Sequence, residues 1–188
     1  MFRLAKRGLL MLLAAGCLSA AAFIVAQAGL PERAAFTGSI FAAGTGYAPE
    51  IAAPAPLFTA RTLDGGVFRL AALRGSPVVL NFWATWCGPC RFELPELQAL
   101  YAALQPRGLR IVAVNLGERP EAARAWVEAL DLTFDIVLDE QRATAARYHL
   151  RGQPSTFIIS PDGVITAIFY GPASADALRA ALAAHLTD

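Results

Sequence analysis

One stretch of the chain, residues 78–104, constrains the fold most, because a strand-like apolar run leads directly into a helical repeat. The run VVLNFW (78–83) has β-branched residues at its start and is typical of a buried strand. The sequence predicts a helix from Cys87 to about Leu104, because leucines recur every three or four positions at Leu94, Leu97, Leu100 and Leu104. A buried strand followed at once by an amphipathic helix is the repeating unit of an α/β fold.

The C-terminal half of the chain continues this alternation. The predicted strands cover 109–116, 134–138, 155–160 and 164–170, and the predicted helices cover 141–148, 175–186 and a stretch opened by Pro120. Turn sequences at 64–66 and 161–163 predict two hairpins, one at each end of this region. We therefore predict an α/β fold whose central sheet is largely parallel and flanked by helices, and is made mixed by the final hairpin.

The N-terminus predicts a membrane segment. Residues 8–30 carry no charged side chain, and roughly 20 apolar residues suffice to span a bilayer. Arg3, Lys6 and Arg7 precede this run, so the positive-inside rule places the N-terminus in the cytoplasm and the rest of the chain outside it. We predict an anchor at 1–30, a flexible Gly-, Ala- and Pro-rich spacer at 31–54, and one folded domain at 55–188.

Two other fates of the N-terminal segment stay open. Ala26-Gln27-Ala28 forms an A-x-A signal for cleavage after Ala28. Cys17 follows Ala-Ala-Gly, which resembles a bacterial lipidation site, although an apolar run continues beyond it. All three fates export the domain. The sequence does not indicate an oligomeric state.

The charge balance excludes a nucleic-acid-binding surface. The chain has 16 Lys and Arg against 15 Asp and Glu, and three of the cations precede the apolar segment. The exported part is therefore slightly acidic and lacks the clustered basic charge that nucleic-acid binding requires.

Two cysteines stand at the junction between the strand and the helix. Cys87 and Cys90 enclose Gly88 and Pro89, and a proline at a helix start gives up an N–H that has no partner there. The thiolate is the reactive form of cysteine, and the positive end of a helix stabilises it. A C-x-x-C pair at this place predicts a redox-active disulfide.

A metal site and an inert disulfide are the alternatives. A structural zinc ion needs four ligands, but the only other thiol is Cys17 in the apolar segment, and the only histidines are His149 and His185. A disulfide across two intervening residues closes a very small loop and adds little stability. We therefore expect no metal and no cofactor beyond the Cys87–Cys90 pair.

The sequence FWATWCGPC, followed by a helix containing Pro95, resembles the active site of thioredoxins, and residues 152–157 resemble the cis-proline loop that faces it. The anchor, spacer, N-terminal hairpin, C-x-x-C-x-x-E-x-P pattern and additional αβ unit between 117 and 138 resemble the TlpA/ResA/CcmG branch. These are membrane-tethered, extracytoplasmic thiol-disulfide oxidoreductases. The resemblance covers roughly 55–188 and implies a thioredoxin-like fold with an N-terminal β-hairpin and an αβ insertion.

The resemblance also implies roles for single residues. Cys87 is expected to be the exposed nucleophile and Cys90 the buried resolving thiol. Pro154 is expected to follow a cis bond, which leaves Gln153 free to pair with an extended substrate segment. Trp86, beside the motif, is expected to be exposed and to shape the substrate face.

Asn81 departs from the cytoplasmic thioredoxins, which carry a buried Asp at this strand position as the proton shuttle of the resolving cysteine. Asn cannot ionise. Glu93 lies three residues after Cys90, so both project to the same helix face, and the TlpA/ResA/CcmG branch has a Glu there. A buried Glu93 would have a raised pKa and is expected to act as the replacement shuttle. The alternative is a solvated surface glutamate.

The expected function is reduction of disulfides in exported proteins by mixed-disulfide exchange. The resemblance implies an electron donor in the membrane of the CcdA/DsbD type, and substrates such as apocytochrome c or copper-centre assembly proteins. A C-x-x-C pair can also run in the oxidising direction. Two other functions stay open, a peroxiredoxin-like thiol peroxidase and a thioredoxin-like copper chaperone. The chaperone has little support, since both methionines lie within the first 11 residues.

Overall fold

The structure, a computed structural model, describes residues 49–186. The predicted anchor at 1–30, most of the spacer and Cys17 lie outside the described residues. Among residues 49–186, no helix has both the length and the apolar character needed to cross a membrane.

A seven-stranded sheet forms the centre of the domain, in the order β2-β1-β5-β4-β3-β6-β7. Its strands are β1 (Thr59–Thr62), β2 (Val67–Arg69), β3 (Val78–Trp83), β4 (Arg110–Leu116), β5 (Asp135–Asp139), β6 (Ser155–Ile159) and β7 (Ile165–Tyr170). The three central strands β5, β4 and β3 are parallel, and every other pairing is antiparallel. The sheet is mixed, as predicted, but it is less parallel than the alternation of strands and helices indicated, because both hairpins join it.

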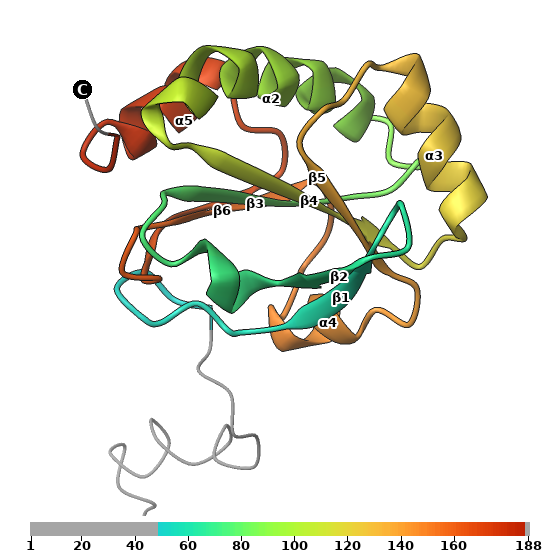
Figure 1. The fold of residues 1–188 in the computed structure, drawn as a ribbon, viewed down its shortest axis with the longest axis horizontal. Coiled ribbons are helices and arrows are strands. Elements are labelled where there is room, and N and C mark those ends of the chain that lie inside the picture. Colours follow the sequence, from blue (N-terminus) through green and yellow to red (C-terminus); the bar gives the residue numbers. More distant parts are fainter. Residues whose placement is uncertain (1–48, 187–188) are drawn as a thin grey trace, which may run out of the picture. The chain divides into compact units, whose positions relative to one another are not determined.

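Helices cover both faces of the sheet (Figure 1). The helices are α2 (Cys90–Leu104), α3 (Pro120–Ala129), α4 (Ala143–Arg147) and α5 (Ala175–Leu182), with 3-10 turns η2 (Leu70–Leu73) and η3 (Gln105–Arg107). Helices α2, α3 and α5 lie on one face, and α4 lies on the other (Figure 1). The predicted N-terminal hairpin corresponds to β1 and β2. The predicted αβ insertion corresponds to α3 and β5.

Strand β3 is buried on both faces, which explains its continuous apolar run. Val79 and Trp83 pack in the cluster beneath α2, whereas Leu80 and Phe82 pack in the cluster on the α4 side. Asn81 shares the face of Val79 and Trp83, since side chains alternate along a strand. The single polar residue of the run is thereby directed toward α2.

Several boundaries differ by a few residues from those predicted; the last helix, for example, ends at Leu182 and not at residue 186. Helix α2 begins at Cys90, not at Cys87, because Cys87 and Gly88 accept i→i+3 hydrogen bonds of a tighter turn, at 3.1 and 3.3 Å. The domain's contacts begin before the predicted boundary at Ala55. The Ala52 N–H donates to the Ile165 carbonyl at 2.8 Å, and the Ala53 carbonyl accepts from the Ile165 N–H at 2.9 Å.

Candidate redox site

Cys87 and Cys90 are joined by a disulfide in the connection between β3 and α2. The S–S distance is 2.05 Å and the two Cα atoms are 5.3 Å apart. We call residues 84–89 the cysteine loop. It opens with a turn in which the Cys87 N–H donates to the Ala84 carbonyl at 3.1 Å. The first α-helical residue is Cys90 itself, so the disulfide joins the loop to the start of the helix.

Both cysteines are buried in the oxidised pair, including Cys87, which was expected to be exposed. Cys87 keeps 4% of its surface exposed, whereas Cys90 keeps none. Trp86, directly before Cys87, is 61% exposed, as predicted. The Cys90 N–H points at Cys87 Sγ at 3.3 Å, and N–H groups at a helix N-terminus favour a thiolate. A reactant that approaches from solvent meets Cys87 first.

Glu93 lies inside the protein at the base of this site. Only 3% of it is exposed, so the alternative of a solvated glutamate is wrong. Its Oε2 accepts from Asn81 Nδ2 at 2.9 Å, and its Oε1 accepts from the Ala173 N–H at 2.9 Å. Asn81 Nδ2 also donates to Thr156 Oγ1 at 2.9 Å, since these two residues face each other across β3 and β6.

Burial raises the pKa of the Glu93 carboxyl above its ordinary value, because desolvation penalises the charged form. The hydrogen bonds from Ala173 and Asn81 lower the pKa and offset part of this rise. Glu93 therefore combines a raised pKa with a place on the same helix face as Cys90, which is also buried.

The Gln153–Pro154 peptide bond is cis, as expected. Strand β6 starts at Ser155, which pairs with Phe82 near the end of β3. Because β3 and β6 are antiparallel, the loop before β6 lies at the end of the sheet where the cysteine loop begins. The Pro154 carbonyl accepts from the Gly171 N–H at 2.9 Å, which ties this loop to the end of β7.

A second polar cluster beside the cysteine loop was not predicted. Glu118, in the connection between β4 and α3, accepts hydrogen bonds from the Thr85 N–H at 2.8 Å and from Asn115 Nδ2 at 2.7 Å. The Thr85 hydroxyl donates to its other oxygen. One sequence signal could have found it: Glu118 follows the end of a predicted strand, and parallel neighbouring strands bring their carboxyl ends to one edge of the sheet.

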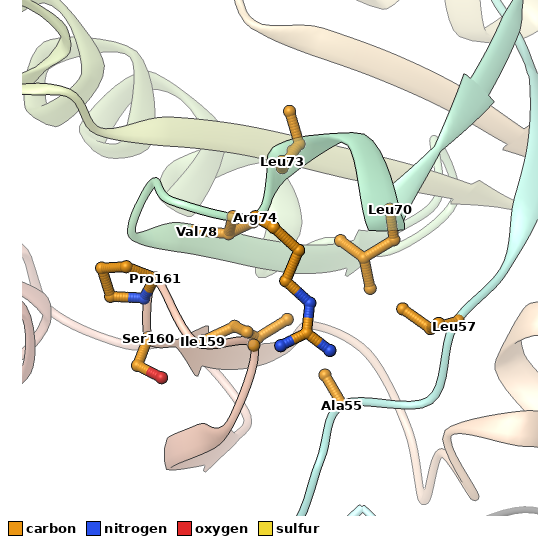
Figure 2. Close-up of a pocket in the computed structure, with 10 residues that line it drawn as sticks. Ala55, Leu57, Leu70, Leu73, Arg74, Val78, Ile159, Ser160 and Pro161 are labelled. Atoms are coloured by element: carbon orange, nitrogen blue, oxygen red, sulfur yellow. The ribbon is translucent and has the colours of Figure 1, made fainter.

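The domain also has a small pocket, at the other end of β3 (Figure 2). It lies beside Val78, the first residue of that strand, and is lined mainly by apolar side chains. The Arg74 side chain extends into it between Leu57 and Ile159 (Figure 2). Its volume of about 10 Å³ is room for roughly one water molecule, so it is no substrate site.

No group of three or more His, Cys, Asp or Glu side chains gathers in the way a metal ion requires, within the part of the chain that the structure describes. The predicted redox site instead brings together Cys87, Cys90 and Glu93. Trp86 lies next to Cys87 in the chain, and the cis-proline loop lies at the same end of the sheet.

Comparison with known proteins agrees with this arrangement. Residues 51–168 match the model of the AhpC/TSA family. The chain is 39% identical over 124 residues to the thiol-disulfide oxidoreductase ResA of Geobacillus thermodenitrificans, an alignment that covers 66% of this chain and 71% of the relative.

Solved structures give the same picture. A secreted Mycobacterium tuberculosis disulfide oxidoreductase homologous to DsbE of E. coli is 32% identical, with a TM-score of 0.62, over 68% of this chain and 95% of the other. A thioredoxin-family thiol:disulfide interchange protein of Chlorobium tepidum is 25% identical, with a TM-score of 0.65, over 73% and 99% of the two chains. The chain therefore belongs to the AhpC/TSA family, with a thioredoxin-like fold, and within it to the thiol-disulfide oxidoreductases that resemble ResA and DsbE.

Proposed function

We propose that the protein is an extracytoplasmic protein-disulfide reductase that works through Cys87 and Cys90. The observation that carries the proposal is the Cys87–Cys90 disulfide at the start of α2, in which Cys87, beside the exposed Trp86, keeps 4% of its surface and Cys90 keeps none. This asymmetry suits a pair in which one thiol attacks and the other resolves.

The proposed reaction starts from the reduced pair. The Cys87 thiolate attacks one sulfur of a substrate disulfide, which forms a mixed disulfide and releases the other substrate sulfur as a thiolate that takes up a proton. Cys90, as its thiolate, then attacks Cys87 Sγ and displaces the second substrate sulfur as a thiolate, which also takes up a proton. The substrate gains two electrons and two protons, and the protein is left with the Cys87–Cys90 disulfide seen in the structure.

Glu93 is proposed to receive the proton that Cys90 loses in the second step. Its raised pKa lets the carboxyl exchange a proton closer to neutral pH than an ordinary glutamate does. Asn81 cannot take this role, because an amide does not ionise, but it holds the carboxyl in place with a 2.9 Å hydrogen bond.

The substrate is proposed to bind over Cys87 between Trp86 and the cis-proline loop. The exposed indole of Trp86 offers an apolar contact. Gln153, half-buried before the cis bond, is proposed to pair through its backbone with an extended segment of the substrate. The relatives named above act on thiols and disulfides, which supports protein disulfides as substrates.

The cellular setting of the reaction is also a proposal. We assign 1–30 as a membrane anchor, 31–54 as a spacer whose last residues pair with the domain, and 55–188 as the catalytic domain, with the domain outside the cytoplasmic membrane. A reductase in an oxidising compartment needs a supply of electrons, so a membrane donor of the CcdA/DsbD type is proposed to reduce the Cys87–Cys90 disulfide again. Apocytochrome c and copper-centre proteins are the proposed substrate classes, and no further cofactor is needed.

Trapping the substrate tests this function. The variant Cys90→Ser keeps the attacking thiol but cannot resolve the mixed disulfide. Expressed as the full chain in its host, it should accumulate covalent complexes that dithiothreitol releases, and mass spectrometry of the partners identifies the substrates. Cys87→Ser is the matched control and should trap nothing. Equal yields from the two variants would rule the proposed order of attack out.

A thiol peroxidase is the second candidate, because the matching family model is described as AhpC/TSA. Hydrogen peroxide consumption by the purified protein with dithiothreitol separates the two functions. The reductase proposal expects reduction of insulin disulfides with peroxide consumption no faster than that of the Cys87→Ser variant. Fast peroxide consumption that depends on Cys87 would favour the peroxidase.

A further inference from the structure

A carboxylate from outside the cysteine loop makes two hydrogen bonds to it. Strand β3 ends at Trp83 and α2 starts at Cys90, and the loop between them is also held by the disulfide and by its own turn hydrogen bonds. The backbone N–H and the hydroxyl of Thr85 both donate to Glu118, one to each carboxylate oxygen. Thr85 is the second residue of the turn that closes with the bond from the Cys87 N–H to the Ala84 carbonyl.

The carboxylate is itself held from the sheet. Asn115 Nδ2 donates to Glu118 Oε2 at 2.7 Å, and Asn115 lies directly beside Trp83 in the pairing of β3 with β4. Gly117, with φ of +69°, provides the left-handed turn that leads the chain from β4 to Glu118. The loop, the carboxylate and the last residues of two strands thus form one closed set of contacts.

The hydrogen bonding of Asn115 indicates that the contacts around Glu118 have a functional role. Its side chain is fully buried, yet its Oδ1 has no hydrogen-bond partner among the residues that the structure describes. A buried polar atom without a partner costs free energy. The Asn115 amide nitrogen therefore makes a short hydrogen bond to Glu118, while the amide oxygen has no partner. This arrangement favours a role for Asn115 in holding the Glu118 carboxylate in place.

We propose that Glu118 is a positioning residue for the redox reaction: it fixes the turn from Ala84 to Cys87 and thereby sets the reactivity of the Cys87 sulfur. This inference rests on the proposed exchange at Cys87 and deepens it. Glu118 acts through Thr85 and is not placed against the reacting sulfur. A sulfur whose approach must be nearly linear reacts more slowly when the loop that carries it is free to move.

Two substitutions separate geometry from charge. Glu118→Gln can keep all three contacts, since its amide oxygen accepts from Thr85 N–H and Asn115 Nδ2 while its NH₂ group donates to the Thr85 hydroxyl, which can also accept. Glu118→Ala removes all three contacts. Glu121→Ala, an exposed acid in the first turn of α3, is the matched control.

The measurement is the second-order rate constant for reduction of the oxidised full-length protein by dithiothreitol, together with the reduction potential against glutathione. Glu118→Ala should slow the reduction at least fivefold and shift the potential, while Glu118→Gln and Glu121→Ala stay within twofold of the unsubstituted protein. A role in stability alone would lower the melting temperature without changing a rate measured well below it. The proposal is overturned if Glu118→Ala matches Glu121→Ala, or if Ala and Gln at position 118 change the rate equally.

A second pair of variants covers the case in which Glu118→Ala does not fold. Thr85→Val removes the hydroxyl contact and keeps the N–H contact, and Thr85→Ser restores the hydroxyl. Thr85→Val should slow the reduction about twofold, and Thr85→Ser should restore it; equal rates for both and for the unsubstituted protein overturn the inference. An unsubstituted protein that exchanges no disulfide at all would instead refute the proposed function.

Discussion

Two Asn–Glu pairs begin on the neighbouring strands β3 and β4, and they differ in burial. Asn81 donates to Glu93 at 2.9 Å, and Asn115 donates to Glu118 at 2.7 Å. Both amides are fully buried, and the Oδ1 of each has no partner within residues 49–186. Glu93 is buried with them, whereas Glu118 is half-buried and reaches the cysteine loop.

The comparison indicates that one arrangement of groups serves two purposes. In the Glu93 pair, burial raises the pKa of the carboxyl and suits it to proton transfer. In the Glu118 pair, the carboxylate accepts two hydrogen bonds from Thr85 and is therefore suited to fix the cysteine loop. Access to water, not the chemistry of the side chains, separates the proposed shuttle from the proposed positioning residue.

The largest expected effect comes from replacing the carboxyl group of each pair by an amide. Glu93→Gln keeps the shape of the side chain but cannot carry a proton, so the resolving step should slow about 100-fold near neutral pH, in the range of general acid–base catalysis. Glu118→Gln should change the same step less than twofold. Rapid acid quenching during a single turnover with a disulfide peptide measures the mixed disulfide, which should accumulate only in Glu93→Gln. Equal accumulation in both variants would contradict the division of roles.

The next effect concerns the two amides. Asn81→Asp removes the donor to Glu93 and places a second carboxyl in a buried site. It should destabilise the domain by about 3 kcal/mol at pH 8, and by less at pH 5, because a lower pH favours protonation of one of the two carboxyls. Asn115→Asp makes the same change beside a half-buried carboxylate and should cost about 1–2 kcal/mol. Urea unfolding at the two pH values measures both, and equal losses for the two variants would show that burial does not distinguish the pairs.

A smaller effect follows from the raised pKa of Glu93. The unfolded-state pKa of a glutamate is about 4.3, so the folded protein keeps this proton to a higher pH than the unfolded chain does. Stability from this group is fully present below the unfolded pKa and is lost as pH rises through the folded pKa. Relative to the unsubstituted protein, Glu93→Gln should therefore become steadily more stable as the pH rises from 4 to 8.

Thermal and urea unfolding across this range test the sign of the change. Leu97→Val, a core variant that alters no titrating group, is the control, and its difference from the unsubstituted protein should stay constant with pH. A difference for Glu93→Gln that is equally flat would mean that the folded and unfolded pKa values of Glu93 are the same.

Most of the fold could be predicted from the sequence, because burial imposes a pattern on each element separately. The run VVLNFW and the leucines of α2 each reveal their own secondary structure. The start of α2 was less predictable. The chain from Cys87 to Pro89 first makes a 3-10-type turn, and local propensity does not distinguish that turn from the first turn of an α-helix.

The site was predictable only where its residues are close in the sequence. Glu93 could be placed near Cys90, because three residues along a helix keep to one face. For Glu118 the sequence indicates only a place at the edge of the sheet where parallel strands end, because its contact with Thr85 spans 33 positions and depends on the register of β3 and β4. The pairing of Asn81 with Thr156 likewise depends on the register of β3 with β6.

The smallest expected effect compares the two threonines, one in each cluster. Thr156→Val removes the oxygen that accepts from the buried Asn81 amide and should cost about 1 kcal/mol, since that donor then lacks one partner. Thr85→Val removes the hydroxyl contact to Glu118 where water can replace it, and should cost about 0.5 kcal/mol. Urea unfolding measures the costs, and the dithiothreitol reaction measures the effect on the sulfur. For the rate of that reaction we expect the larger effect from Thr85→Val, because Thr85 is part of the loop that carries Cys87 while Thr156 is in the sheet. If the same variant had the larger effect on both the unfolding free energy and the dithiothreitol rate, the two threonines would not differ in role as proposed.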